Sequence, residues 1–193
     1  MFEKVHQAIN KISPLSDEAF ALISPLFKHN IYPKNTLLCK AGEIPSDFYF
    51  INSGVMRGYT ETPKGVNYNT SIFHSHQFSG PKSALILKKP SRINYETLTE
   101  CDLITIDYYK MMDLCQTNHE ILKLSHRLLE LYFVSLERRA ITLGSLNAKE
   151  RYLALKKRFK QFENDIPQYH IASLLGITPI QLSRIRRELA QES

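Results

Sequence analysis

The chain has 193 residues, of which 43% are hydrophobic, and this composition is typical of a globular protein and excludes disordered and collagen-like chains. Its length corresponds to about 1.3 ordinary domains, so we expect one domain with a small additional unit. Most of the net charge of +6 lies in the C-terminal part of the chain. Residues 144–193 hold nine Lys/Arg against five Asp/Glu, whereas residues 1–143 hold sixteen against fourteen. Such a basic unit permits a polyanionic partner.

The N-terminal segment predicts short helices and no secretion signal. Residues 1–13 carry a charge every few positions without the apolar run that a signal peptide requires. Val5 and Ile9 have helical spacing, and Ser16 before Phe20 is a suitable start for a second helix. No window of the chain approaches 18 consecutive apolar residues, and the three widely spaced cysteines indicate free thiols in a reducing compartment. We therefore expect a cytoplasmic protein without a membrane span.

From about residue 30 to residue 107 the sequence pattern changes to alternation. Apolar and polar positions alternate over residues 66–72, 93–97 and 103–107, as in strands with one buried face. Short turn signals such as Asn52, Ser53 and Gly54 separate these runs. Many short strands with regular turns predict an antiparallel sandwich or barrel of six to eight strands.

Residues 119–143 predict one uninterrupted helix, because they contain neither Gly nor Pro. Two apolar stripes run along this helix, and a helix with two apolar faces has to bury both. In one arrangement, the same helix of a second copy covers the first stripe, which then forms a dimer interface. In the alternative, both stripes pack within one subunit. The first stripe consists of Leu122, Leu129, Tyr132, Leu136 and Leu143, and the second of Ile121, Leu124, Leu128 and Leu131.

A boundary is expected at Gly144 and Ser145, which predict the end of the long helix, while Asn147 is a suitable N-cap for the next one. The chain is thereby divided into residues 1–117, 118–144 and 145–193. A basic amphipathic helix is predicted over residues 148–162, with Tyr152, Leu155, Phe159 and Phe162 inward and basic residues that include Lys157 and Lys160 mostly outward.

The last 26 residues predict two helices joined by a tight turn. Gly176 supplies the positive φ that ends the first helix. Thr178 is a suitable N-cap for the second helix, and Pro179 suits its first position. Leu182, Ile185 and Leu189 then face inward. This arrangement is typical of a DNA-binding helix-turn-helix.

The outward side chains of the second helix have the chemistry of base recognition. Gln pairs with adenine and Arg with guanine, while later arginines and Lys157 suit phosphates. We therefore expect double-stranded DNA as the partner. The alternative is that the arginines only solvate the outer face of a three-helix bundle. The residues expected at DNA are Thr178, Gln181, Ser183, Arg184, Arg186, Arg187 and Lys157.

The order of these parts resembles the bacterial transcription regulators of the cyclic-AMP receptor protein and fumarate-nitrate regulator (Crp/Fnr) superfamily. The resemblance covers nearly the whole chain and rests on residues 40–43 (KAGE), 47–54 (DFYFINSG) and 171–185 (IASLLGITPIQLSRI). It implies an α+β fold with an N-terminal antiparallel double-stranded β-helix, the jelly-roll barrel of cyclic-nucleotide-binding-like domains. A long dimerisation helix and a C-terminal helix-turn-helix domain would follow. It also implies a homodimer on a pseudo-palindromic site and makes RNA polymerase a candidate partner.

The effector site departs from the pattern that this resemblance implies. Nucleotide-responsive members hold the ribose with a Gly-Glu pair and the cyclic phosphate with an Arg-Ser pair. Here Pro81 replaces the Glu, and Arg92 is displaced by one position, which in an extended segment turns a side chain to the other face. We therefore expect no cofactor and no cyclic AMP bound in the usual way. The degenerate effector pocket would comprise Phe78, Ser79, Gly80, Pro81, Ser91, Arg92 and Leu136.

Other function classes have weaker support in the sequence. No G-x-S-x-G, P-loop or H-E-x-x-H motif and no cluster of closely spaced cysteines occurs, so neither an enzyme nor an iron-sulfur sensor is expected. His74 with His76, or Cys115 with His119, would supply only two ligands each, so no metal site is expected. Two alternatives stay open: a barrel that regulates a protein partner through its helical tail, and a sensor of another small ligand.

Overall fold

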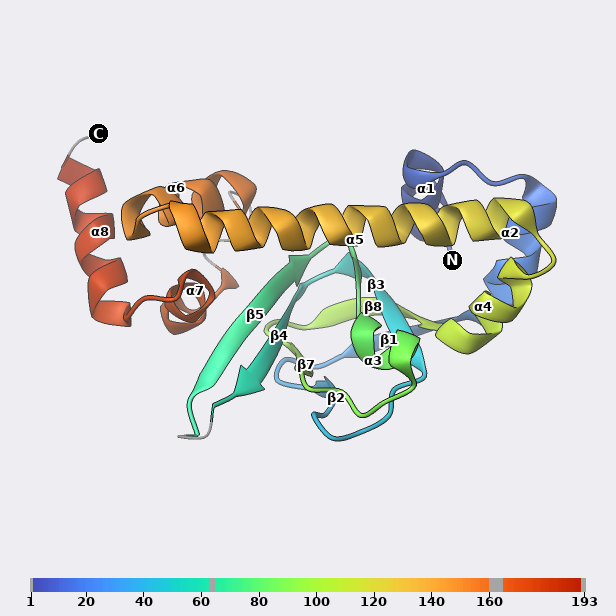
Figure 1. Ribbon diagram of the computed structural model, residues 1–193, viewed down its shortest axis with the longest axis horizontal. Helices are drawn as coiled ribbons and strands as arrows, with labels where there is room; N and C mark the ends of the chain where they lie inside the picture. The colour runs from blue at the N-terminus through green and yellow to red at the C-terminus, as the bar shows by residue number, and fades with distance from the viewer. Residues whose placement is uncertain (1, 63–64, 160–164, 192–193) are drawn as a thin grey trace.

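The computed structural model describes residues 2–62, 65–159 and 165–191. Within these residues, two short helices precede an eight-stranded antiparallel barrel, and a short helix, a long helix and three further helices follow it. The long helix lies across the barrel, and the last three helices lie at the C-terminal end of the long helix (Figure 1). The expected α+β fold of a barrel followed by helices is confirmed. Among the described helices, none combines the length and the apolar character that a membrane span needs.

The N-terminal helices form where the sequence predicts them. They are α1 (Glu3–Ile12) and α2 (Asp17–Ile23), and the short 3-10 helix η1 (Ser24–Leu26) follows. The Ser16 side chain caps α2 by accepting a hydrogen bond from the backbone N–H of Ala19 at 3.2 Å. The Ser16 hydroxyl also donates to the Glu120 carboxylate at 3.0 Å, which ties this cap to the start of the long helix.

The barrel consists of two four-stranded sheets in which neighbouring strands are antiparallel. The first sheet has the order β1 (Phe27–Tyr32), β8 (Cys101–Asp107), β3 (Asp47–Ser53) and β6 (Phe78–Ser79). The second has the order β2 (Leu37–Cys39), β7 (Asn94–Thr97), β4 (Val55–Glu61) and β5 (Asn67–His74). A short helix, α3 (Lys82–Leu87), lies between β6 and β7 in the chain.

Strand β3 divides the core because its side chains alternate between two sides. Phe48 and Phe50 pack with the helices outside the barrel, in a cluster that includes Ile121 of the long helix. Tyr49 and Ile51 pack between the two sheets, with residues such as Met56 and Leu103. The barrel is therefore held by one apolar core inside it and another that joins it to the helices.

The burial of β5 and of Val66, the residue before it, corrects the sequence prediction of alternation over residues 66–72. Val66, expected to be buried, is 62% exposed, whereas Asn69, expected on the polar face, is completely buried. The reason is that α7, one of the C-terminal helices, packs on β5 and covers Asn69. A register shift between Gly58 and Tyr59 of the neighbouring β4 also interrupts the regular alternation.

The long helix α5 (His119–Ser145) follows α4 (Tyr108–Cys115) and extends two residues beyond its predicted end. Gly144 continues the helix, and Leu146 is the C-cap. Of the second apolar stripe, Ile121 and Leu124 are buried, but Leu131 is 43% exposed. That stripe therefore packs on the barrel side only in its first part.

The C-terminal helices are α6 (Ala148–Arg158), α7 (Gln168–Leu175) and α8 (Pro179–Gln191). Asn147 and Glu150 form a reciprocal capping box at the start of α6, as the predicted N-cap at Asn147 requires. Tyr152, Leu155 and Phe159 face inward as predicted, whereas Phe162 and Lys160 lie outside the described residues. One apolar cluster joins these helices to the barrel through Val55, Ile72 and Leu98.

Candidate functional site

The turn between α7 and α8 has the geometry that its sequence predicts. Gly176 ends α7 in the left-handed region with φ of +68°. The Ile177 N–H then donates to the carbonyl of Ala172 at 3.0 Å. The Thr178 hydroxyl oxygen accepts a hydrogen bond from the Gln181 N–H at 3.2 Å, so Thr178 caps α8. These contacts fix the direction of α8 relative to α7.

The outer face of α8 presents most of the side chains that the sequence places there. Gln181, Ser183, Arg184 and Arg187 are exposed. Arg186 is different, because its side chain is partly buried and its Nη1 atom is inaccessible to solvent. At about 100° per residue, Arg186 lies only about 40° from the buried Leu182. The prediction that Arg186 faces outward is therefore wrong for most of its side chain.

Ile180 is a residue of this face that the sequence analysis missed. It is 77% exposed at the second position of α8, next to Gln181. Its angular position on the helix is close to those of Arg184 and Arg187. Its sequence position could have indicated this, because Ile180 is apolar but does not share the helical spacing of the inward residues Leu182, Ile185 and Leu189. An exposed apolar side chain beside polar ones can contact a thymine methyl group.

Lys157 is exposed on α6, as predicted, and Lys156 beside it is exposed too. Both belong to the last turn of α6, where cations interact favourably with the helix dipole. The surface of the C-terminal helices thus carries separate lysines and arginines on α6 and α8. The expectation of a short or absent wing before α7 depends on residues 160–164, which lie outside the described residues.

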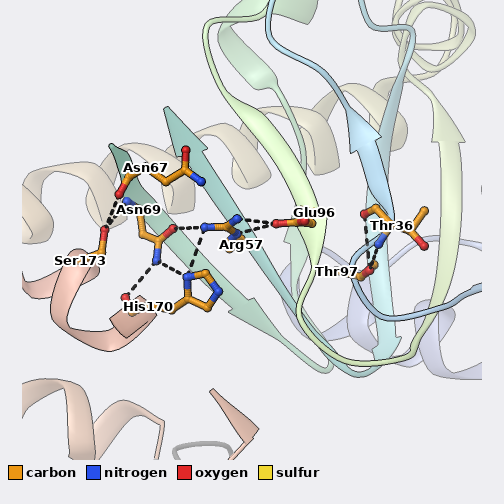
Figure 2. A network of polar contacts seen from close by, with 8 residues as sticks. All are labelled: Thr36, Arg57, Asn67, Asn69, Glu96, Thr97, His170 and Ser173. Atoms are coloured by element: carbon orange, nitrogen blue, oxygen red, sulfur yellow. Dashed lines mark hydrogen bonds and ion pairs between the residues drawn. The ribbon is translucent and has the colours of Figure 1, made fainter. Parts of the chain in front are cut away.

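A buried polar network joins α7 to the barrel (Figure 2). Its centre is Arg57 of β4, whose Nη2 lies 2.6 Å from Oε2 of Glu96 on β7. The Nη1 atom of Arg57 lies 3.2 Å from both the Asn69 side-chain oxygen and the His170 Nδ1. Asn69 Nδ2 also donates to the His170 carbonyl at 3.0 Å, and the Asn69 N–H donates to the Ser173 hydroxyl at 2.9 Å. Residues from three strands and one helix are thereby linked.

His170 is held neutral in this network. Its Nδ1 faces two donors, the Arg57 guanidinium and the Asn69 amide, so it accepts and the ring proton belongs on Nε2. Burial, together with the positive charges of Arg57 and Lys34, lowers the pKa of His170 to about 4. The sequence alone does not predict the network of Arg57, Asn69 and His170, because their pairing depends on contacts between residues far apart in the chain.

The residues expected at the effector pocket do not converge on one open site. Gly80 has φ of +144°, and a Cβ there would lie 2.9 Å from the Phe48 Cβ, so the position requires glycine. Pro81 is the N-cap residue of α3. Ser91 is buried and donates to the Ile93 carbonyl at 2.7 Å, whereas Arg92 is exposed. Leu136 lines a different cavity, between β5, α5 and α6.

The space between the two sheets is occupied by large side chains. Tyr49 and Met56 are buried there, and Phe73 stacks on Tyr95 with 6.3 Å between ring centroids. The Tyr49 hydroxyl donates to the Leu38 carbonyl at 3.0 Å. Burial raises the pKa of both Tyr49 and Tyr95 well above the usual value, so both phenols stay neutral.

The first apolar stripe of α5 is mostly exposed in the single chain. Leu122, Leu129 and Leu136, spaced seven residues apart, are each nearly half exposed. Phe133, on the same face, is 65% exposed. Tyr132 instead lies against the barrel side, with the Lys82 Nζ 4.5 Å from its ring centroid. Leu143, the last member of the stripe, is partly buried.

Comparison with known proteins connects these features to characterised folds. Residues 30–118 match the family model of the cyclic nucleotide-binding domain, which covers most of the barrel and α4. No curated protein matches the chain at a significant level.

Solved structures with a similar fold cover most of the chain. FixK2 from Bradyrhizobium japonicum is 16% identical with a TM-score of 0.72, over 86% of this chain and 85% of that chain. The c-di-GMP responsive global regulator CLP from Xanthomonas campestris is 19% identical with a TM-score of 0.68, over 91% and 90% of the two chains. A protein assigned to the crp/fnr family of transcriptional regulators from Eubacterium rectale is 16% identical with a TM-score of 0.69, over 92% and 85%.

Proposed function

We propose that this chain, which has a cyclic nucleotide-binding domain and the fold of the Crp/Fnr regulators, is a DNA-binding transcription regulator that acts as a homodimer. The observation that carries the proposal is the outer face of α8, where Gln181, Arg184 and Arg187 are exposed behind a capped helix start. A non-enzymatic regulator also agrees with the absence of catalytic motifs in the sequence.

The α7 and α8 helices form a helix-turn-helix in this proposal, with α8 as the recognition helix in the major groove. The N-terminal residues of such a helix contact base edges, which suits Ile180, Gln181 and Arg184. Lys157 of α6 and Arg187 of α8 contact phosphates and contribute affinity without sequence preference. Arg186 is withdrawn from this set because its side chain is partly buried.

The dimer in this proposal is parallel and is formed by the exposed face of α5. Leu122, Leu129 and Leu136 recur every seven residues, and Phe133 lies between them on the same side, as in a coiled-coil seam. Two C-terminal units would then be related by a twofold axis, which predicts a pseudo-palindromic site. Tyr132 contributes less than the sequence suggests, since its ring is engaged with Lys82.

The barrel is not a standard cyclic AMP receptor in this proposal. Pro81 stands where the ribose-binding carboxylate is expected, Arg92 is exposed while Ser91 is buried, and aromatic side chains fill the space between the sheets.

Selection of duplexes from a random pool by the purified, ligand-free protein tests the proposal. Enrichment of a palindrome, with affinity that falls steeply as salt concentration rises, is the expected result. If no sequence is enriched and binding to any duplex is absent at low salt, the proposed function is wrong, and the regulation of a protein partner through the helical tail becomes the better hypothesis.

A further inference from the structure

A cavity of about 240 Å³ lies outside the barrel, where α3, α4 and α5 meet. Its lining includes Phe78, Lys82, Leu85, Met111, Ser125 and Leu128, and we call it the α3–α5 cavity. Of the residues expected at the effector pocket, only Phe78 belongs to this lining. The α3–α5 cavity is therefore distinct from the space between the two sheets. That space is filled by Tyr49, which points to the opposite side of β3, and by Met56 of β4.

Among the described residues that line this cavity, Lys82 is the one that carries a charge. Its Nζ lies 4.5 Å from the centroid of the Tyr132 ring, and no carboxylate of the described residues lies within 4 Å of it. A cation–π contact replaces only part of the hydration that an ammonium group loses on burial. Accordingly, burial lowers the pKa of Lys82 to about 8, which still leaves the group mostly charged at neutral pH.

The remaining wall of the cavity is apolar apart from hydroxyl groups such as that of Ser125. The Ser125 hydroxyl donates to the Met112 thioether at 3.9 Å and also interacts with the Cys115 side chain, and both sulfur atoms are weak acceptors. Leu85 and Met111 are buried in the surrounding core, so they hold the wall in place. The cavity therefore combines apolar walls, one uncompensated positive charge and a hydroxyl donor that lacks a strong acceptor.

We propose that the α3–α5 cavity binds a small monoanionic carboxylate with an apolar chain or ring, with Lys82 as its counter-ion and Ser125 as a hydrogen-bond donor. A single cation suits a single negative charge, whereas a phosphate dianion would leave charge unpaired in an apolar site. The volume lies below the range of about 300–1,000 Å³ for drug-sized ligands, so the ligand is small. The proposal is independent of DNA binding, because its test contains no DNA.

Calorimetric titration with octanoate and with its neutral isostere octanamide tests the site. The wild-type protein should bind octanoate at least about tenfold more tightly than octanamide at pH 7, which is the scale of one charge-assisted hydrogen bond. In K82M this preference should disappear while octanamide binding is unchanged. K89M removes an exposed lysine just beyond the same helix and should behave as the wild type. At pH 9.5, above the pKa of about 8 of Lys82, the preference of the wild type should weaken.

Several results would overturn the proposal. Equal affinities for octanoate and octanamide, or equal losses in K82M and K89M, would show that Lys82 is not the counter-ion. The titration also includes straight-chain acids from butanoate to decanoate, benzoate and naphthoate, and the absence of saturable binding by every acid would show that the cavity is not a site. K82M replaces a partly buried cation with an apolar side chain, so it should keep the wild-type melting temperature. If its melting temperature is lower, the comparison of the wild type at pH 7 and pH 9.5 decides, and an undiminished preference for octanoate at pH 9.5 overturns the proposal.

Discussion

In the proposed complex with DNA, different side chains of the C-terminal helices contact bases and phosphates. Arg184 lies in the first half of α8, the proposed recognition helix, whereas Lys157 lies on α6. R184A should weaken the free energy of DNA binding by about 1–3 kcal/mol and relax the base preference at one position of the site. K157A should weaken all duplexes alike and reduce the salt slope by about 1. Competition binding with single-base variants of the selected site, at several salt concentrations, measures both effects.

The outcome that contradicts this division is equally specific. If R184A and K157A lower affinity by the same factor for every duplex, Arg184 contacts phosphate and not a base. If neither substitution changes binding, the outer face of α8 is not the recognition surface, and its arginines only solvate a helical bundle.

The Arg57 and Glu96 pair is the second residue-scale feature that can be tested. The Arg57 side chain is buried and lies 2.6 Å from the Glu96 carboxylate. E96Q leaves the guanidinium without its counter-ion and should lower the free energy of unfolding by about 3 kcal/mol. E61Q makes the same charge change at the exposed end of β4 and should have little effect. Urea unfolding of both variants checks the prediction, and equal stabilities would show that Arg57 needs no counter-ion.

These residues also show what sequence reasoning can reach at this scale. The exposed side chains Gln181, Arg184 and Arg187 follow from helical spacing once Leu182 and Ile185 are taken as inward, because the pattern is local. Alternation predicts Asn69 on the polar face of its strand, since nothing within the strand indicates that a distant helix covers it. Burial of a polar residue by a nonlocal partner cannot be inferred from alternation.

Among the elements, α5 carries the proposed dimer seam. F133D places a carboxylate in the middle of the exposed stripe, where a partner helix would have to desolvate it, and should raise the dimer dissociation constant at least about a hundredfold. L131D introduces the same charge on the opposite side of the helix and should leave the dimer intact. Sedimentation equilibrium distinguishes the two variants. A monomeric wild-type protein would contradict the proposed homodimer, and an intact dimer in F133D would place the interface elsewhere.

The existence of the long helix and of the C-terminal helices was predictable, but their ends were less so, and α3 was not predicted. The long helix was expected because 25 residues without Gly or Pro keep a helical pattern, yet it continues through Gly144. A single glycine costs a helix only about 1 kcal/mol, so a helix already held at its other end can include it. Asn147 marks the next start reliably, because its capping box with Glu150 is encoded within four residues.

At the scale of the whole molecule, the polar network around Arg57 fixes the position of α7 on the barrel. Arg57 and Asn69 belong to the barrel, and His170 and Ser173 belong to α7, so every bond between the pairs crosses from one part to the other (Figure 2). Arg139 of α5 adds a bond to the Asn69 carbonyl at 3.1 Å. A movement of α7 and α8 relative to the barrel would have to break these bonds together.

This network makes the stability of the whole chain depend on pH. The pKa of His170 is about 4 in the folded chain and near 6.5 in the unfolded chain, so the unfolded chain binds the proton more readily between these values. The contribution of neutral His170 is therefore complete above about pH 6.5 and is lost as the pH falls toward 4. Unfolding by urea at pH 7, 6, 5 and 4.5 should show a falling free energy of unfolding.

The variant H170N separates this effect from other titrations. Its amide oxygen can accept the hydrogen bonds that Nδ1 accepts but does not titrate, so the fall between pH 7 and 5 should be smaller than in the wild type. Burial also lowers the pKa of His74, which contributes a fall of the same sign in both proteins and cancels in the comparison. H126N removes an exposed histidine of α5 and should keep the wild-type slope. If H170N and the wild type lose stability in parallel, His170 is not the group that couples the seating of α7 on the barrel to pH.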